Sequence, residues 1–204
     1  MSDPAGASAQ AAGIAPEDEA RAALYGLIAR LFYAPPDEGV LAQLLHTNAF
    51  ADGNAPVALA WRKLVEAART VFPVVLENEH TELFVGTGKA EVTPYLTHYT
   101  ILYATDNPLV ELRQQLARWG MGRRENASEP EDHIAGICEA MRMAIAVQHR
   151  SIEEQRGFFD AFIYRGGIAF CNAVSASAKA SFYVLVAQFA RAFLELEREA
   201  FEML

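Results

Sequence analysis

Apolar side chains recur at spacings of three and four residues along most of this chain, which is the period of one face of an α-helix. The first such stretch begins at Glu17, with acidic residues in its first turn, and ends before Pro35 and Pro36. Its apolar positions are Leu24, Leu27, Ile28, Leu31 and Phe32. Because two consecutive prolines cannot continue a helix, we expect a core helix that stops at this pair.

Prolines and capping residues predict where the next helices begin. Val40 to Leu45 favour a short second helix, and a third begins near Pro56. Pro73 should end or kink that helix before a further segment runs to Phe84. Asn107 and Pro108 then resemble a cap followed by a first-turn proline, in a helix that ends at Trp119-Gly120.

The stretch from residue 128 onward is typical of a helix start. Ser128 and Glu131 fit a capping box, and Pro130 suits a first turn. One apolar stripe follows, made of Ile134, Ile137, Cys138, Met141 and Ile145. Ser151 and Glu154 form a second capping-box pattern, and a last long helix carries Phe182, Leu185, Val186, Phe189, Phe193 and Leu196.

Two stretches lack a helical period. Residues 85–99 contain two glycines and a proline and predict a surface loop, and residues 120–128 have the composition of a linker or hinge. We find no repeats and no convincing strands. The pattern therefore predicts an all-α protein with a disordered tail at residues 1–16 and one globular helical domain at residues 17–204.

Net charge, apolar runs and cysteine positions limit which partners and which compartment fit this chain. The formal net charge of −9 disfavours nucleic acid and anionic lipid as partners and favours basic ligands. No apolar run reaches the roughly 18 residues of a membrane span, and the first 16 residues lack the basic start of a secretory signal. Cys138 and Cys171 lie within apolar helical patterns, which fits packed thiols in a reducing compartment. We expect a cytoplasmic protein.

The candidate motifs for binding a cofactor or a metal are incomplete. The stretch GTGKA lacks the first glycine and the final Ser or Thr of a phosphate-binding loop. Glu77 and His80 form one Glu-x-x-His half-motif, but a carboxylate-bridged di-metal bundle needs two copies. Neither cysteine has the spacing of a nucleophilic or redox motif. We expect no cofactor, no metal and no enzymatic activity.

The pair Asp132-His133 remains as candidate chemistry. Acids near the start of a helix stabilise its positive end by roughly 0.3 to 1 kcal/mol each, which accounts for Glu129, Glu131 and Asp132 without a function. His133 is not explained in that way, because its charge can change near neutral pH. A purely structural role and a binding role both stay open for this pair.

Five short blocks occur in a fixed order along the chain: RAALYGLIARLFYAPP, ELFVGTG, PYLTHY, PEDHIAGICEAM and EEQRGFF. This ordered set resembles the TorD/DmsD family of cytoplasmic chaperones for twin-arginine-exported redox enzymes, and the resemblance runs from about residue 20 to 195. It implies an all-helical TorD-like fold. It also implies a maturation chaperone that binds the twin-arginine leader or immature body of a molybdenum-cofactor oxidoreductase until cofactor loading finishes, and that holds back export.

The resemblance also implies a leader-binding groove, and its residues carry over one by one. They are Leu83, Phe84, Gly86, Pro94, Tyr95, Asp132 and His133, with Tyr25 as a weaker addition. Two positions depart from the family pattern. Leu96 stands where a polar residue is usual, and FIYRG at residues 162–166 replaces a His-Leu-x-Pro-Trp element.

A groove that binds an arginine pair followed by an apolar segment needs an acidic rim and an apolar floor. We expect Glu129, Glu131 and Asp132 to form the rim, and Leu83, Phe84, Pro94 and Tyr95 to form the floor. Two other classes stay open: a helical enzyme or metal protein that uses His80, His98 and His133, and a helical module with an unrelated partner. The linker also raises the hypothesis of a homodimer that exchanges its C-terminal helices.

Overall fold

The computed structural model describes residues 14–47, 50, 53–86, 88–103, 106–122 and 129–204. Within these residues the chain is all-α, as predicted, and contains no β-strand. The helices are α1 (Pro16–Tyr33), α2 (Glu38–His46), α3 (Pro56–Ala68), α4 (Pro73–His80), α5 (Pro108–Arg118), α6 (Ile134–Ala146), α7 (Ile152–Phe158), α8 (Tyr164–Ala176) and α9 (Phe182–Glu202). Three short turns of other helix types are η1 (Thr81–Val85), η2 (Leu96–Tyr99) and η3 (Phe159–Ile163).

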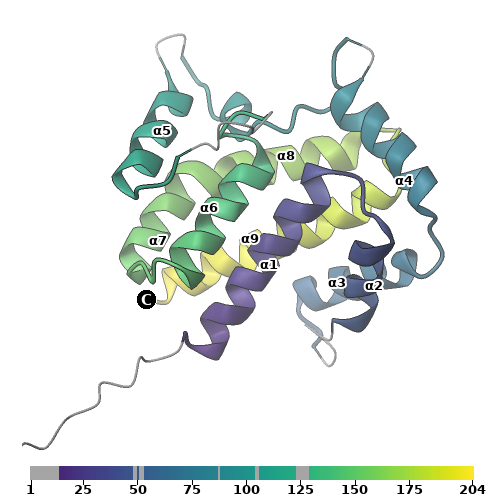
Figure 1. The fold of residues 1–204 in the computed structure, drawn as a ribbon, viewed down its shortest axis with the longest axis horizontal. Helices are drawn as coiled ribbons and strands as arrows, with labels where there is room; N and C mark the ends of the chain where they lie inside the picture. Colours follow the sequence, from purple (N-terminus) through teal and green to yellow (C-terminus); the bar gives the residue numbers. More distant parts are fainter. Residues whose placement is uncertain (1–13, 48–49, 51–52, 87, 104–105, 123–128) are drawn as a thin grey trace, which may run out of the picture.

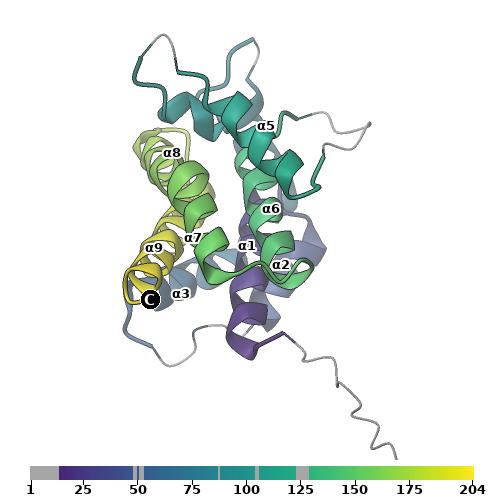
Figure 2. The same cartoon turned by 90° about the vertical axis from the view of Figure 1, so that its left-hand side faces the viewer.

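The helices pack in two layers. Helix α1 runs along α6 on one side, and α8 and α9 run along each other on the other side, with α3 against α9 (Figures 1 and 2). Aromatic side chains fill the space between the layers. Phe32 of α1 meets Phe170 of α8 edge to face, with ring centroids 4.9 Å apart, and Tyr25 of α1 meets Phe193 of α9 at 5.0 Å.

Most helix starts agree with the sequence signals. Helices α3, α4 and α5 each have their proline in the first turn, and α1 begins one residue before Glu17, at Pro16. The Ser151-Glu154 capping box is present in full at the start of α7. The predicted end of α5 is also confirmed, since Gly120 has the positive φ of 67° that a terminating glycine adopts.

The predicted start of α6 is wrong. The helix begins at Ile134 with His133 as its N-cap, so its first turn contains no acidic residue. Residues 130–133 instead form a turn in which the His133 N–H donates to the Pro130 carbonyl at 3.2 Å. Backbone bonds to the loop at residues 94–96 occupy the groups that an earlier helix start would have used. Ser128, the other half of the predicted box, lies outside the described residues.

The predicted loop at residues 85–99 is shaped by one glycine and contains one helical turn. Gly86 has φ +64°, and a Cβ at that position would lie 2.2 Å from the Lys89 carbonyl oxygen. Only glycine fits this turn. The loop then ends in η2, whose Leu96 is buried and lies against α8. The departure from the family pattern at Leu96 therefore adds to the core.

A second departure also has a packing explanation. Gly166, in the FIYRG segment, lies where α8 crosses η2, and a Cβ there would lie 2.8 Å from the Leu96 carbonyl oxygen. The glycine thus permits close approach of α8 to the loop that carries Tyr95.

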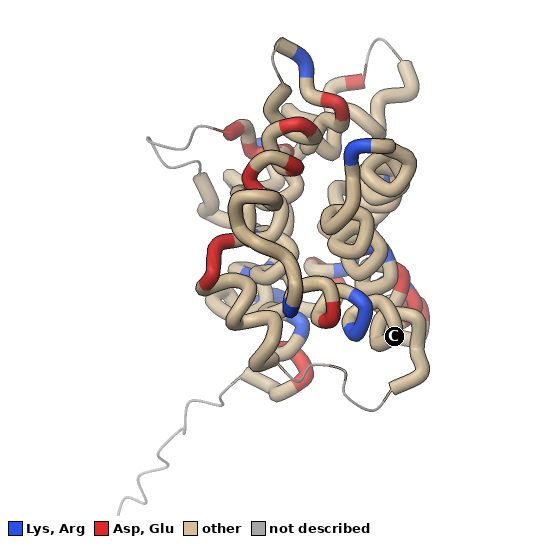
Figure 3. Tube along the Cα trace, turned by 90° about the vertical axis from the view of Figure 1, so that its right-hand side faces the viewer, with Lys and Arg blue, Asp and Glu red and all other residues tan. Residues whose placement is uncertain are grey.

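The remaining sequence expectations concern the tail, the hinge, the two cysteines and membrane insertion. Most of the predicted tail (residues 1–13) and of the predicted hinge (residues 123–128) lies outside the described residues. Cys138 and Cys171 are both buried and unbridged. None of the described helices is long and apolar enough to cross a bilayer. Figure 3 shows acidic and basic positions on many of the described elements.

Candidate functional site

Two of the predicted site motifs meet at the amino-terminal end of α6. The Pro-Tyr pair and the Asp-His pair form an isolated antiparallel bridge. On one side of it the Leu96 N–H donates to the Asp132 carbonyl at 2.9 Å, and on the other the Ile134 N–H donates to the Pro94 carbonyl at 2.9 Å. The bridge fixes the loop before η2 to the start of α6, so both motifs belong to one site.

Asp132 lies inside this junction. Its residue is only 4% exposed, and its carboxylate accepts a hydrogen bond from the Thr97 hydroxyl. A carboxylate held in this way stabilises the contact between the loop and α6. Asp132 is therefore buried, whereas the sequence analysis expected it to lie at the rim of the groove.

His133 caps α6 and is 5% exposed. Its Nδ1 accepts a hydrogen bond from the Ala135 N–H at 3.1 Å, which requires that this nitrogen carry no proton. Burial lowers the pKa of His133, while the nearby Glu129 and Asp132 carboxylates oppose that shift. The neutral imidazole is thus the form that fits both the cap and the surroundings.

Tyr95 presents its hydroxyl to the surface. Its ring lies edge to face with His133 at a centroid distance of 5.9 Å, and the hydroxyl donates to Oε2 of Glu129 at 2.8 Å. The hydrogen bond to this carboxylate, together with burial, raises the pKa of Tyr95 to about 12. Tyr95 therefore stays a neutral hydrogen-bond donor across the physiological range of pH.

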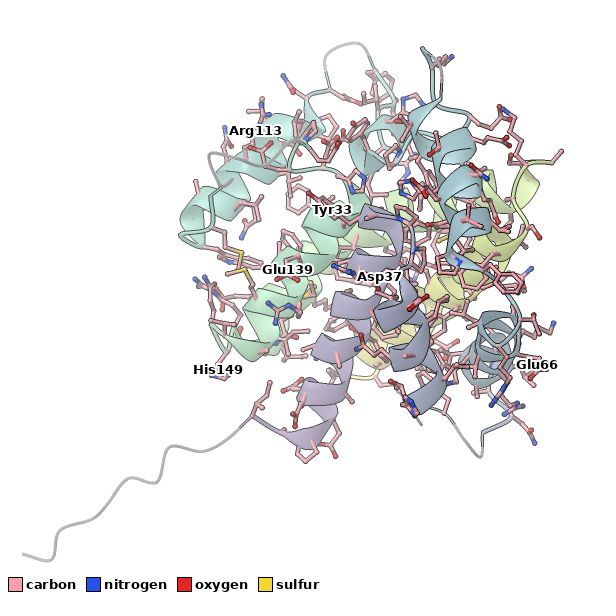
Figure 4. All side chains as sticks on the ribbon, turned by 45° about the vertical axis from the view of Figure 1, so that its right-hand side comes forward. Tyr33, Asp37, Glu66, Arg113, Glu139 and His149 are labelled. Carbon is pink, nitrogen blue, oxygen red and sulfur yellow. The ribbon has the colours of Figure 1, made fainter. Side chains whose placement is uncertain are left out.

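A groove of about 610 Å³ opens beside this junction, between α1 and α6. We call it the α1–α6 groove. Its walls are Gly26, Ala29, Arg30 and Tyr33 of α1; Leu116, Met121 and Gly122 at the end of α5; Glu129, Pro130, Glu131 and His133 before α6; and Ala135, Gly136, Glu139, Ala140 and Met143 of α6. Figure 4 shows Tyr33 and Glu139 at this groove, with Arg113 of α5 above them.

The groove joins an apolar floor to charged edges. Glu131 pairs with Arg113 at 3.0 Å and Glu139 with Arg142 at 2.6 Å, and Arg30, on the α1 side, pairs with Asp37 at 3.0 Å. These pairs are partly exposed, so each contributes little to stability.

Sequence reasoning found part of this groove. Glu129, Glu131 and His133 line it, and the Tyr95 hydroxyl contacts it through Glu129. The other predicted residues lie outside the groove wall. Leu83 and Phe84 are buried in the core, where the Phe84 ring meets Phe32, His80, Phe170 and Tyr183.

The remaining predicted residues shape the scaffold. Gly86 makes the turn after η1, and Pro94 is buried under the bridge. Tyr25 is fully buried, and its hydroxyl donates to Glu197 of α9 at 3.0 Å. None of these three positions is part of the groove wall.

Small and flexible residues of the groove were missed. Gly26 and Ala29 on α1, and Gly136 and Ala140 on α6, follow helical spacing and leave room between the helices. Such a pattern equally fits two helices in close contact, so the sequence alone does not distinguish a groove from a seam. Tyr33, which is 54% exposed, carried the clearest signal, because it is an aromatic residue two positions before a pair of prolines.

The three histidines of the alternative hypothesis have different surroundings. His80 and His133 are buried and His98 is exposed. Burial lowers the pKa of His80, and its Nε2 has no hydrogen-bond partner among the described residues. Within the described part of the chain, no group of three or more His, Cys, Asp or Glu side chains could hold a metal ion.

Comparison with known proteins gives two matches. The sequence model of the nitrate reductase delta subunit family matches residues 51–165. A crystal structure from Archaeoglobus fulgidus, of a protein proposed to be a redox enzyme maturation protein, aligns with a TM-score of 0.54 at 20% sequence identity. The alignment covers 86% of this chain and 93% of that chain, so the two share a fold. No curated protein sequence matches significantly.

Proposed function

We propose that this chain, which belongs to the nitrate reductase delta subunit family of TorD-like redox enzyme maturation proteins, binds a basic and apolar segment of an enzyme precursor in the α1–α6 groove. The segment that fits is a twin-arginine leader, in which an arginine pair precedes an apolar stretch. The precursor that carries this leader would be a molybdenum-cofactor oxidoreductase. Binding in the cytoplasm would shield the leader until cofactor loading is complete and so delay export.

The observation that carries this proposal is the composition of the groove. Alanine and glycine residues of α1 and α6, together with Met143 of α6, form an apolar floor, and Glu129 lies at the end next to the bridge. Methionine is unbranched and adapts to varied apolar surfaces, which suits leaders of differing sequence. A carboxylate beside an apolar floor is the complement of an arginine beside an apolar segment.

The net charge of −9 supports the same assignment. It favours a basic ligand over an acidic one at long range. The immature body of the enzyme is a second candidate ligand for the groove. Its exposed apolar segments would compete with the leader for the same apolar floor.

Calorimetry with a synthetic peptide tests the groove. The peptide carries an Arg-Arg pair followed by an apolar segment. We expect Tyr33→Ala to weaken its binding on the order of tenfold, because a ring covered by the ligand loses its apolar contact. Met143→Ala should weaken binding by a smaller factor for the same reason.

The matched control is Phe72→Ala. Phe72 is an aromatic residue, is 70% exposed, and lies before α4, away from the groove. Its removal should leave affinity unchanged. If Tyr33→Ala and Met143→Ala bind the peptide as tightly as the unmodified protein does, the groove is not the binding site.

A further inference from the structure

The acidic residues around the α1–α6 groove differ in what they already contact. Glu131 pairs with Arg113, and Glu139 pairs with Arg142. For Glu129 the described residues supply a neutral partner, the Tyr95 hydroxyl, and no Lys or Arg within ion-pair distance. Among the described residues, its negative charge is therefore compensated less than that of Glu131 and Glu139.

The contact with Tyr95 also fixes the geometry of Glu129. The Tyr95 backbone is held by the bridge to α6, and its ring lies against His133. The Tyr95 hydroxyl donates a hydrogen bond to Oε2 of Glu129, and no described residue donates a hydrogen bond to Oε1. One carboxylate oxygen is thus anchored, while the described residues leave the other as an acceptor at the groove. An anchored carboxylate loses less side-chain freedom when it binds a ligand.

We propose that Tyr95 is a positioning residue that holds Glu129 as the acceptor for a guanidinium group in the groove. This inference rests on the proposed function, because the guanidinium is that of a bound arginine. It moves arginine selectivity away from Asp132, which is buried and engaged with Thr97. It also gives Tyr95 a polar role, through its hydroxyl, in place of the apolar floor role that the sequence suggested.

The Glu129 carboxylate can accept hydrogen bonds from the Tyr95 hydroxyl and from a guanidinium group at the same time. A carboxylate has about four acceptor sites on its two oxygens, so the tyrosine hydroxyl and a guanidinium can bind together. The guanidinium contributes a charge-assisted bond, which is stronger than a bond between neutral groups. Loss of the tyrosine hydroxyl would free the Glu129 side chain to rotate and lower its affinity for arginine, while leaving apolar contacts in place.

A double-mutant cycle with two peptides tests this role. The variants are Tyr95→Phe, Glu129→Gln and the double variant, and the peptides carry Arg-Arg or Gln-Gln before the same apolar segment. For the Arg-Arg peptide we expect about a tenfold loss with Glu129→Gln and about a threefold loss with Tyr95→Phe. The double variant should lose no more than Glu129→Gln alone, because Tyr95 acts through Glu129.

The Gln-Gln peptide separates positioning from packing. Its affinity should be equal for all four proteins, since it offers no guanidinium. Full affinity of Tyr95→Phe for the Arg-Arg peptide would overturn the proposal, and so would an equal loss for both peptides, which would indicate a structural role. Failure of the proposed function looks different: neither peptide would then depend on Tyr33, whatever the state of Tyr95.

Asp132→Asn provides the internal comparison. Because its carboxylate is buried beside Thr97, we expect any loss of affinity to be the same for both peptides and to accompany a lower melting temperature. A selective loss for the Arg-Arg peptide with normal thermal stability would return the arginine contact to Asp132 and overturn the assignment to Glu129.

Discussion

His133 combines two functions at one position, because its imidazole caps α6 and its ring borders the groove. The cap depends on the neutral form, because Nδ1 accepts the Ala135 N–H. His80, next to Phe84 in the core, is a second buried histidine whose pKa burial lowers. A histidine with a lowered pKa makes the folded protein sensitive to acid, since the unfolded chain binds protons more readily.

The free energy of unfolding should therefore decrease as the pH falls from about 7 to about 5. Below the ordinary histidine pKa of 6.5 the unfolded chain is protonated at His80 and His133 while the folded chain resists protonation. The stabilisation is fully present above pH 6.5 and is lost as the pH falls through the lowered folded-state pKa. Urea denaturation at several pH values measures this slope.

His133→Asn is the informative variant. Asparagine keeps a side-chain acceptor for the Ala135 N–H but does not titrate. We expect it to reduce the dependence of stability on pH, whereas His133→Ala should also lose about 1 kcal/mol from the missing cap at every pH. An unchanged slope in His133→Asn would contradict the assignment of the acid sensitivity to this residue.

At the scale of single residues, the sequence identified Asp132 and His133 but could not assign their environment. The side chain that satisfies Asp132 belongs to Thr97, and no local pattern connects the two. An aspartate in an acidic stretch is expected to be exposed, because burial of a carboxylate requires a partner that only the folded chain supplies. Glu129 illustrates the same limit, since its partner Tyr95 also lies in a distant loop.

At the scale of helices, α9 depends on a carboxylate from another element. Ser181, its N-cap, makes no side-chain cap bond. Instead, Glu79 of α4 accepts backbone N–H bonds from Ser181 at 2.7 Å, Phe182 at 3.1 Å and Tyr183 at 2.8 Å. A carboxylate at a helix amino terminus satisfies unpaired donors and interacts favourably with the helix dipole.

We predict that Glu79→Ala destabilises the protein by roughly 2 to 3 kcal/mol, because it leaves several buried N–H groups unpaired. Glu77→Ala, at an exposed position on the same helix, should change stability by less than about 0.5 kcal/mol. Chemical denaturation measures both, and hydrogen exchange at residues 181–183 should accelerate in the first variant only. Equal effects of the two substitutions would show that the cap adds nothing.

Helix starts were predictable where the signal is local. The first-turn prolines of α3, α4 and α5 and the capping box of α7 act within one turn of the helix they begin. The start of α6 was not, because the bridge to residues 94–96 replaces a cap box with contacts from a distant loop. The sequence likewise did not predict η2, because its Leu96 packs closely against α8 at Gly166, which is a contact with a distant element.

At the scale of the whole molecule, the first and last helices are joined by a buried network. Arg21 of α1 donates to both carboxylate oxygens of Glu197 of α9, at 2.8 and 2.9 Å, and Tyr25 donates to the same carboxylate. Glu197 is only 3% exposed. Periodicity predicted both helices and the all-α class, but it carries no information on this pairing, which depends on how the layers assemble.

The charge of the whole chain acts on ligands before any groove contact forms. A formal charge of −9 produces a negative potential that attracts a basic peptide over distances comparable with the Debye length, about 10 Å at 0.1 M salt and about 3 Å at 1 M. Contacts with the apolar floor form later and are insensitive to salt. Long-range attraction should therefore govern association, and the groove should govern dissociation.

We predict that the association rate of the Arg-Arg peptide falls as ionic strength rises, while its dissociation rate changes little. Stopped-flow fluorescence at several salt concentrations separates the two rates. The Gln-Gln peptide should associate more slowly at low salt and show a weaker dependence on ionic strength. Glu129→Gln removes one of 26 acidic residues, so it should barely alter association but should accelerate dissociation of the Arg-Arg peptide. Equal salt dependence for the two peptides would show that net charge does not steer binding, even if the groove itself binds both.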